Sequence, residues 1–206
     1  MKITALFVFC LIFLPTFLNC AQPVSVELIA ASKCPDTSSW EDEVASKLLY
    51  YIGDIFTLRV DFLASYQKTN DKYTFKCMHG ETECEGNKYE LCAQKHYQND
   101  WKYFDYIECL NQNQYDIPQN AETCSKHLSL DWDTLETCYK TESASLFVQS
   151  IDTVNSKYPV NWVPTIFING QYFCKWHDGD CPSSWTGFRD KICDEYQGTK
   201  PSGCSQ

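Results

Sequence analysis

Cysteine content constrains this chain more than any other feature of its sequence. There are 13 cysteines in 206 residues. Two of them, Cys10 and Cys20, fall within residues 1–20, where one lysine followed by a short apolar run is typical of a cleaved secretory signal peptide. Removing these two from 13 leaves 11 for the mature chain, and most cysteines of a secreted protein are paired. Because 11 is odd, we expect at least one thiol that is free or pairs with another molecule.

Charge and hydrophobicity narrow the classes of partner. The formal net charge is −10 and lysine and arginine form no cluster, so we expect neither nucleic acid nor an anionic membrane as a partner. Beyond residues 1–20, no apolar run approaches the length that spans a bilayer, and we expect residues 21–206 to be soluble. At 206 residues the chain is long enough for one globular domain with a sizeable insertion or for two small domains, and its 44% hydrophobic residues suffice for a packed core.

The mature chain opens with the pattern of a strand, a helix and a second strand. Residues 24–30 and 55–64 both alternate apolar and polar side chains, which predicts strands. Between them, apolar side chains from residue 40 to residue 52 recur at the spacing of one helix face. The sequence therefore predicts β-α-β, with Cys34 in the first turn.

The last third predicts the complementary half of a sheet. Residues 165–168 and 171–174 flank Asn169-Gly170, the strongest short signal for a hairpin, and residues 185–196 carry a helical apolar stripe. A β-α-β half and a β-β-α half, with a cysteine after the first strand and Pro164 just before the hairpin, is the layout of thioredoxin-like domains.

Residues 66–158 lie between the two halves and have mostly helical spacing. Six cysteines fall in this region: Cys77, Cys84, Cys92, Cys109, Cys124 and Cys138. The sheet is incomplete without both flanks, so we interpret the region as an insertion and not as a separate domain. The predicted fold class is α/β: one thioredoxin-like domain over residues 21–206 with a disulfide-stapled, mainly helical insertion.

A cysteine-rich segment of the insertion carries the most specific motif. Residues 77–92 (CMHGETECEGNKYELC) fit C-x-H-G-x2-E-C-x2-N-x4-C at every fixed position. This segment resembles the signature of the gamma-interferon-inducible lysosomal thiol reductase family. The tail CDEYQGTKPSGC and the stretch YPVNWVPTIFING look like the C-terminal element and the proline loop of that family. The resemblance covers nearly the whole mature chain.

The resemblance implies a thioredoxin-like fold that reduces protein disulfides in the endosomal–lysosomal pathway at acidic pH. The implied partners are disulfide-bonded protein substrates and a low-molecular-weight thiol as reductant, and we expect no cofactor. The chain would enter the secretory pathway and end in the lysosome or outside the cell. Members of the family usually act through C-x-x-C directly after the first strand. Here that position holds Cys34-Pro35-Asp36-Thr37, so Cys34 matches the attacking cysteine and the resolving cysteine is missing.

Cys34 precedes the predicted helix, whose unpaired N–H groups favour a thiolate. Lys33 would favour the thiolate further, and Asp36 would oppose it. Ser38 and Glu41 match the capping box S-x-x-E, which would begin the helix at Ser38 and leave Cys34 about one turn outside it. The alternative is that Cys34 is half of a structural disulfide. The odd cysteine count favours a free Cys34, because the other ten can then form five bridges.

Three residues near Cys34 complete the candidate site. Pro164 matches the proline that thioredoxin-like folds hold in cis opposite the active cysteine. By resemblance, the backbone around Val163 would hold an extended substrate segment beside Cys34. Thr37 cannot resolve a mixed disulfide, but its hydroxyl can donate a hydrogen bond to the Cys34 thiolate. Cys34, Thr37 and Pro164 are therefore the catalytic candidates and Val163 the substrate-binding candidate.

The other ten cysteines are candidates for structural disulfides. Proximity in the sequence and the family tail favour the pairs Cys174–Cys181 and Cys193–Cys204, whereas the pairing of the six cysteines in the insertion stays open. The polar side chains of the signature, His79, Glu83 and Asn87, are expected to bond nearby backbone. A zinc site formed by the cysteines and the histidine of residues 77–92 is a less favoured alternative in an oxidising pathway, and we predict no metal.

Two functional hypotheses remain. The first is a thiol–disulfide oxidoreductase that acts through the single nucleophile Cys34 and needs an external thiol to complete its cycle. The second is a catalytically inactive family member that kept the disulfide-rich fold and acts as a binding or scaffold protein. The missing resolving cysteine at Thr37 motivates the second hypothesis.

Overall fold

A mixed four-stranded sheet forms the centre of the domain. The computed structural model describes residues 21–98 and 101–205, and the expected signal peptide at residues 1–20 lies outside them. The strand order is β2–β1–β5–β6. The strands are β1 (Val24–Ala30), β2 (Phe56–Phe62), β5 (Thr165–Ile168) and β6 (Gln171–Lys175). β1 runs parallel to β2 and antiparallel to β5, and β5 runs antiparallel to β6.

The inner strands follow the patterns in the sequence. Leu28 in β1 pairs with Val60 in β2 and Ile166 in β5, and all three side chains are buried. Asn169 and Gly170 have positive φ angles of 50° and 72°, as the two-residue hairpin turn requires. The thioredoxin-like fold class predicted from the sequence is confirmed.

The helix after β1 is continuous through three segments and packs on the last helix. The segments are α1 (Pro35–Trp40), a π-helical stretch η1 (Glu41–Ala45) and α2 (Ser46–Ile52), followed by a short 3-10 turn (Gly53–Ile55). Trp40 is fully buried, and its ring meets the ring of Phe188 in α8 (Trp185–Glu195) edge-on at 5.8 Å. This contact anchors the helix that follows Cys34.

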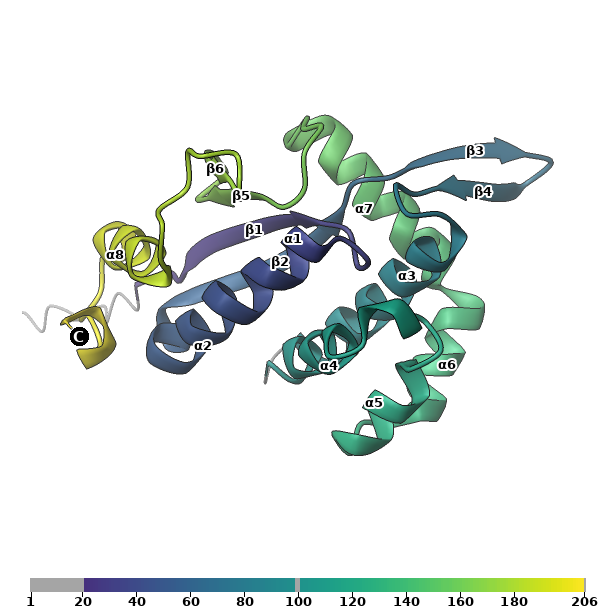
Figure 1. Ribbon diagram of the computed structural model, residues 1–206, viewed down its shortest axis with the longest axis horizontal. Coiled ribbons are helices and arrows are strands. Elements are labelled where there is room, and N and C mark those ends of the chain that lie inside the picture. The colour runs from purple at the N-terminus through teal and green to yellow at the C-terminus, as the bar shows by residue number, and fades with distance from the viewer. Residues whose placement is uncertain (1–20, 99–100, 206) are drawn as a thin grey trace, which may run out of the picture.

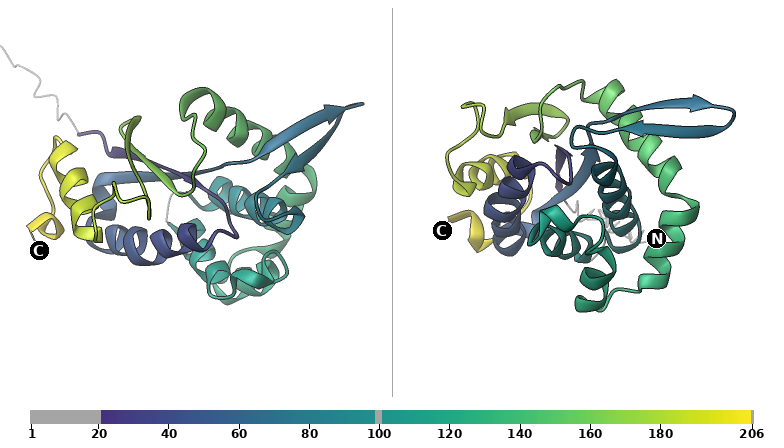
Figure 2. Two further views of the ribbon diagram at one scale, coloured as in Figure 1. Left: turned by 45° about the horizontal axis from the view of Figure 1, so that its top comes forward. Right: turned by 45° about the vertical axis from the view of Figure 1, so that its right-hand side comes forward.

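In the described part of the insertion there are one hairpin and five α-helices. The helices are α3 (Glu81–Tyr97), α4 (Lys102–Asn111), α5 (Ala121–His127), α6 (Trp132–Thr141) and α7 (Ser143–Lys157). α3 and α7 pack against each other and against β2. In Figures 1 and 2 the hairpin of β3 (Ser65–Thr69) and β4 (Lys72–Lys76) projects away from the body of the domain. The sequence patterns missed this hairpin, which turns on Asn70 and Asp71 at positive φ.

Five disulfides stabilise the fold among the residues that the structure describes. Cys174 pairs with Cys181 and Cys193 with Cys204, the two pairs that the sequence favours. In the insertion, Cys77–Cys84 closes the loop before α3, Cys92–Cys138 joins α3 to α6, and Cys109–Cys124 joins α4 to α5. Each bridge typically stabilises a small domain by about 2–5 kcal/mol. Within the described ranges, the helices are too short or too polar to cross a membrane.

Candidate active site

Cys34 occupies the N-cap position of α1. Its backbone N–H donates to the carbonyl of Ala31 at 2.9 Å, and its own carbonyl accepts from the N–H of Ser38 at 3.1 Å. The predicted capping box is wrong, because the helix begins earlier, at Pro35. Proline suits the first helical position, since its φ is already helical and its missing N–H is not needed there. Cys34 therefore lies at the helix terminus and not one turn outside it.

The thiol of Cys34 faces a groove between two loops. Among the described residues, Cys34 is the one cysteine outside a disulfide, and it is 7% exposed. Its Sγ lies 3.9 Å from the carbonyl oxygen of Val163. The groove has a volume of about 430 Å³. It is lined by Cys34, Pro35, Asp36, Met78, His79, Asn161, Trp162 and Val163.

The proline loop forms one wall of this groove. The peptide bond between Val163 and Pro164 is cis, as the sequence predicts. The carbonyl of Pro164 accepts from the N–H of Trp176 at 3.1 Å, and the indole N–H of Trp162 donates to the carbonyl of Trp176 at 3.1 Å. These bonds hold the loop against the end of β6, so the backbone of Val163 stays opposite the Cys34 sulfur.

Thr37 lies behind the thiol, buried in the first helical turn. Its side chain is 1% exposed, and Oγ1 has no hydrogen-bond partner among the described residues. The hydrogen bond to the Cys34 sulfur that the sequence allows is therefore not formed in this state. A second sulfur is absent at this position, so Cys34 has no resolving partner in α1.

Both charged neighbours of Cys34 are engaged elsewhere. The Lys33 ammonium donates to the carbonyls of Tyr115 and Ile117, each at 3.0 Å, which turns its charge toward the loop after α4. Asp36 Oδ1 lies 2.9 Å from Nδ1 of His177. His177 could not be identified from the sequence, because no motif marks it. Lys33 therefore does not support a thiolate by direct contact, and the charge of Asp36 is shared with an imidazole.

The signature segment forms the opposite wall and is bonded to the Cys34 loop. Asn87 Oδ1 accepts from the N–H of Ser32 at 3.0 Å, and the hydroxyl of Ser32 donates to the carbonyl of Glu83 at 3.2 Å. Backbone bonding was expected for these side chains, and Asn87 does accept from a backbone N–H. Its partner, Ser32, is distant in sequence and lies in the turn after β1, two residues before Cys34. The signature thus positions the turn that carries the thiol.

Gly86 allows this close approach. A Cβ added there would lie 2.4 Å from Cγ2 of Ile117 and 2.5 Å from Oγ of Ser32. We expect Gly86→Ala to destabilise the fold by about 1–3 kcal/mol, through overpacking. Thermal unfolding would measure this. Gly53→Ala is the matched control, because its Cβ would meet only Trp101 at an ordinary 3.6 Å and its φ is −57°. Equal melting temperatures for the two variants would contradict the prediction.

Three buried carboxyl groups lie behind the signature wall. Glu41, Glu83 and Glu90 are all buried, and Oε1 of both Glu41 and Glu90 has no hydrogen-bond partner among the described residues. Burial raises the pKa of Glu41 to about 8, although Asn111 Nδ2 donates to its Oε2 at 2.8 Å and opposes the shift. Burial, together with the charges of Glu41 and Glu83, raises the pKa of Glu90 well above its usual value. Glu41 is thus neutral under mildly acidic conditions.

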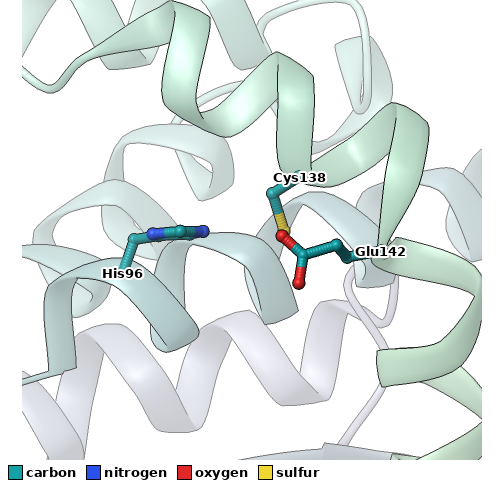
Figure 3. A group of neighbouring side chains, drawn as sticks. All are labelled: His96, Cys138 and Glu142. Carbon is teal, nitrogen blue, oxygen red and sulfur yellow. The ribbon is translucent and has the colours of Figure 1, made fainter.

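No thiolate is available for either candidate metal site. The zinc alternative fails because Cys77 and Cys84 form a disulfide with each other and Cys92 forms one with Cys138. Figure 3 shows a second cluster, His96, Cys138 and Glu142, with potential ligand atoms within 4.8 Å of one another. Its sulfur belongs to the same Cys92–Cys138 bridge, and Glu142 forms an ion pair with Lys95. This cluster is therefore a disulfide with polar neighbours.

Comparison with known proteins decides the family. Residues 25–128 match the family described as Gamma interferon inducible lysosomal thiol reductase (GILT). The chain belongs to the GILT family. The gamma-interferon-inducible lysosomal thiol reductase of Carassius auratus is 28% identical over 90% of this chain and 74% of its own length. GILT-like protein 1 of Drosophila melanogaster is 27% identical over 90% of this chain and 80% of its own length.

Solved structures support the same fold at low sequence identity. Oxidised BdbD from Bacillus subtilis aligns with a TM-score of 0.57 and 18% identity, covering 82% of this chain and 85% of that one. Reduced DsbA from Mycobacterium tuberculosis aligns with a TM-score of 0.58 and 14% identity, covering 88% and 86%. Together, the GILT family and the thioredoxin-like fold assign the chain to the thiol–disulfide oxidoreductases in general.

Proposed function

We propose that this GILT-family chain reduces disulfides in protein substrates through Cys34 as its single nucleophile, with an external thiol completing the cycle. The observation that carries the proposal is a free thiol at a helix N-terminus, facing a groove, with Thr37 in the resolving position. The N–H groups of the first helical turn favour negative charge on the sulfur. The remaining ten mature cysteines are paired and leave Cys34 as the thiol for exchange.

The cycle proceeds through mixed disulfides. The Cys34 thiolate attacks one sulfur of the substrate disulfide, forming a new S–S bond, and the second substrate sulfur leaves with the electron pair and takes up a proton. An external thiol, such as free cysteine or glutathione, then attacks Cys34 Sγ and releases the first substrate sulfur as a thiol. A second external thiol removes the first from Cys34 and restores the thiolate. The substrate disulfide gains two electrons and two protons, and the two external thiols become a disulfide.

The walls of the groove suit an extended, partly apolar segment. Met78 and Trp162 line it and are 58% and 38% exposed, so they offer apolar contacts on either side of the thiol. The buried Val163 carbonyl already faces Cys34. Pairing with this backbone, supported by Pro164, would place a substrate cystine at the Cys34 sulfur. Such segments are found in partly unfolded proteins, which supports protein disulfides as the substrate class.

The proposed setting is the secretory pathway, with an acidic lysosomal or extracellular endpoint. Five disulfides support an oxidising route, because such bridges are rare in the cytosol. The raised pKa of Glu41 supports an acidic endpoint, because its buried carboxyl is neutral there.

Trapping the mixed disulfide tests the single-cysteine cycle. We expect acid-quenched mixtures with a cystine-containing peptide to contain a covalent adduct on Cys34, which glutathione releases. In Thr37→Cys the adduct should not accumulate, because residues three apart in the first helical turn are neighbours and the new thiol can resolve it. Thr37→Ser is the matched control and should accumulate the adduct like the wild type. Mass spectrometry without any Cys34 adduct in the wild type would contradict the proposal.

A further inference from the structure

The histidine of the signature lies in the same groove as Cys34. His79 lines the groove from the opposite wall, and its side chain is 37% exposed. The chain contains four histidines, all within the described residues, and His79 is the one among them that lines the groove. The proposed exchange releases a substrate sulfur in this space, so the imidazole stands next to a reaction that needs a proton.

Glu83 holds the imidazole in one orientation. A close hydrogen bond joins Nδ1 of His79 to Oε2 of Glu83, and Oε1 of Glu83 accepts from the backbone N–H of His79 at 3.3 Å. Glu83 is fully buried, at 0% exposure, and its main chain is bonded to the hydroxyl of Ser32. A carboxylate on Nδ1 fixes the tautomer and the ring orientation, so Nε2 is the ring nitrogen left for the groove.

A disulfide and a turn fix the loop that carries His79. The disulfide Cys77–Cys84 spans it, and Gly80, at a φ of 89°, makes the turn into α3 between His79 and Glu83. Asn87, further along α3, accepts from the N–H of Ser32 near Cys34. The imidazole and the thiol therefore stand on segments that are bonded to each other.

We propose that His79 is the general acid of the exchange and that Glu83 is its positioning residue. The inference rests on the proposed attack by Cys34. As the bond from Cys34 Sγ to one substrate sulfur forms and the substrate S–S bond breaks, the leaving sulfur takes the electron pair and a proton from Nε2 of His79. Each of the two external thiols gives its proton to Nε2 as it attacks. The first of these protons passes to the substrate sulfur that leaves Cys34, and the second restores the protonated imidazole, so the proton balance closes within one cycle.

The need for this acid depends on the leaving group. A thiolate of low basicity leaves readily without a proton, whereas an alkyl thiolate, as in cystine, is a poorer leaving group. A positioned proton donor should therefore accelerate cleavage of alkyl disulfides and have little effect on aryl disulfides. This selectivity separates proton donation from a purely structural role, because a displaced wall would slow both reactions.

The test compares oxidised glutathione with 5,5′-dithiobis(2-nitrobenzoate) in single-turnover formation of the Cys34 adduct, at about pH 5.5, where a histidine can carry the proton. In His79→Gln we expect the glutathione reaction to slow by roughly 10- to 100-fold and the aryl reaction to change by less than about twofold. Glu83→Gln should show a smaller loss in the same direction. His127→Gln, at an exposed position in α5, is the matched control and should change neither rate.

Other outcomes would overturn the inference. His79→Gln that slows both reactions equally, or neither, contradicts proton donation by His79. A selective loss in His177→Gln would assign the proton to the imidazole beside Asp36 instead. If His79→Gln does not fold, the wild type alone decides: across a series of disulfides from aryl to alkyl, its rate should depend less steeply on leaving-group basicity than that of free glutathione. Failure of the proposed function would appear separately, as a wild type that forms no adduct with either substrate.

Discussion

Cys34→Ser is expected to lower disulfide-reductase activity by at least about 100-fold, because it removes the only nucleophile that the protein supplies to the proposed cycle. The measurement is reduction of a disulfide-bonded protein at about pH 4.5–5.5 with added free cysteine or glutathione. Serine is nearly isosteric, so the fold should persist. Loss of activity with an unchanged melting temperature would therefore report chemistry and not unfolding.

Two controls sharpen this expectation. Wild-type protein alkylated with iodoacetamide should lose activity to the same extent, because Cys34 is the one free thiol among the described cysteines. Mass spectrometry of that sample should place a single label on Cys34. Activity that survives Cys34→Ser would contradict the single-nucleophile assignment. A wild type that is inactive with every thiol supply would favour the scaffold hypothesis that Thr37 motivates.

The rate of alkylation against pH separates the same two hypotheses without a substrate. A Cys34 thiolate stabilised by the first turn of α1 should react with iodoacetamide faster at mildly acidic pH than free cysteine does. A scaffold protein has no need of such a thiolate, and its Cys34 should follow free cysteine. Because Cys34 is only 7% exposed, its alkylation is slowed at every pH. The shape of the pH profile therefore separates the two hypotheses, whereas the absolute rate does not.

The central sheet could be predicted from the sequence because its signals are local. Alternation in β1 and β2 and the Asn169-Gly170 turn each lie within a few consecutive residues. The start of α1 could not be fixed from signals that are just as local. The S-x-x-E match would begin the helix at Ser38, whereas α1 begins at Pro35 and the Ser38 hydroxyl donates to the carbonyl of Pro35.

Only part of the candidate site could be predicted from the sequence, because one of its walls depends on long-range contacts. Cys34 and Pro164 could be assigned because they occupy fixed places relative to strands. The wall formed by His79 depends on contacts between segments far apart in the chain, such as the bond from Ser32 to Asn87. Spacing within residues 77–92 contains no information about that partner. The disulfide Cys92–Cys138 was unpredictable on the same ground, because it depends on how α3 packs against α6.

The fold is expected to be most stable near about pH 5 and to lose stability toward neutral pH, because of its buried carboxyl groups. The pKa of Glu41 rises from 4.5 to about 8 on folding, chiefly by desolvation, and the nearby charges of Asp42 and Glu108 act in the same direction. A carboxyl with a raised pKa is neutral in the fold and ionises first in the unfolded chain. Its contribution is therefore fully present below pH 4.5 and is lost as the pH rises from there toward about 8.

Exposed carboxylates set the acidic limit of this window. Four of them have lowered pKa values, because of hydrogen bonds or ion pairs to neighbouring groups: Asp131, Glu142, Asp180 and Glu195. Their contribution has the opposite sign, since it is present above their unfolded pKa values and is lost as the pH falls through the folded ones. The buried and the exposed carboxyl groups together place the maximum of folding stability between strongly acidic and neutral pH.

Glu41→Gln isolates the contribution of the buried Glu41 carboxyl to the pH dependence of stability. Glutamine keeps the shape of the neutral carboxyl and can still accept from Asn111, but it cannot ionise in the unfolded chain. We expect wild type and variant to be equally stable at about pH 4.5, and the variant to be more stable at about pH 7.5 by on the order of 4 kcal/mol. Urea unfolding followed by tryptophan fluorescence at both pH values measures the difference. Glu43→Gln, an exposed carboxyl on the same π-helical stretch, is the matched control and should leave the pH dependence unchanged.

The outcome bears on where the chain works. Wild-type stability that rises from pH 4.5 to 7.5, or a Glu41→Gln variant with the wild-type slope, would contradict neutral burial of this carboxyl. A maximum near pH 5 that shifts upward in the variant would show that Glu41 tunes the fold to acid. Glu83 positions His79, and its charge contributes to the raised pKa of the neighbouring Glu90. If ionisation at neutral pH disrupts the packing of Glu41, Glu83 and Glu90, it should therefore affect the groove wall that carries His79 as well as the core.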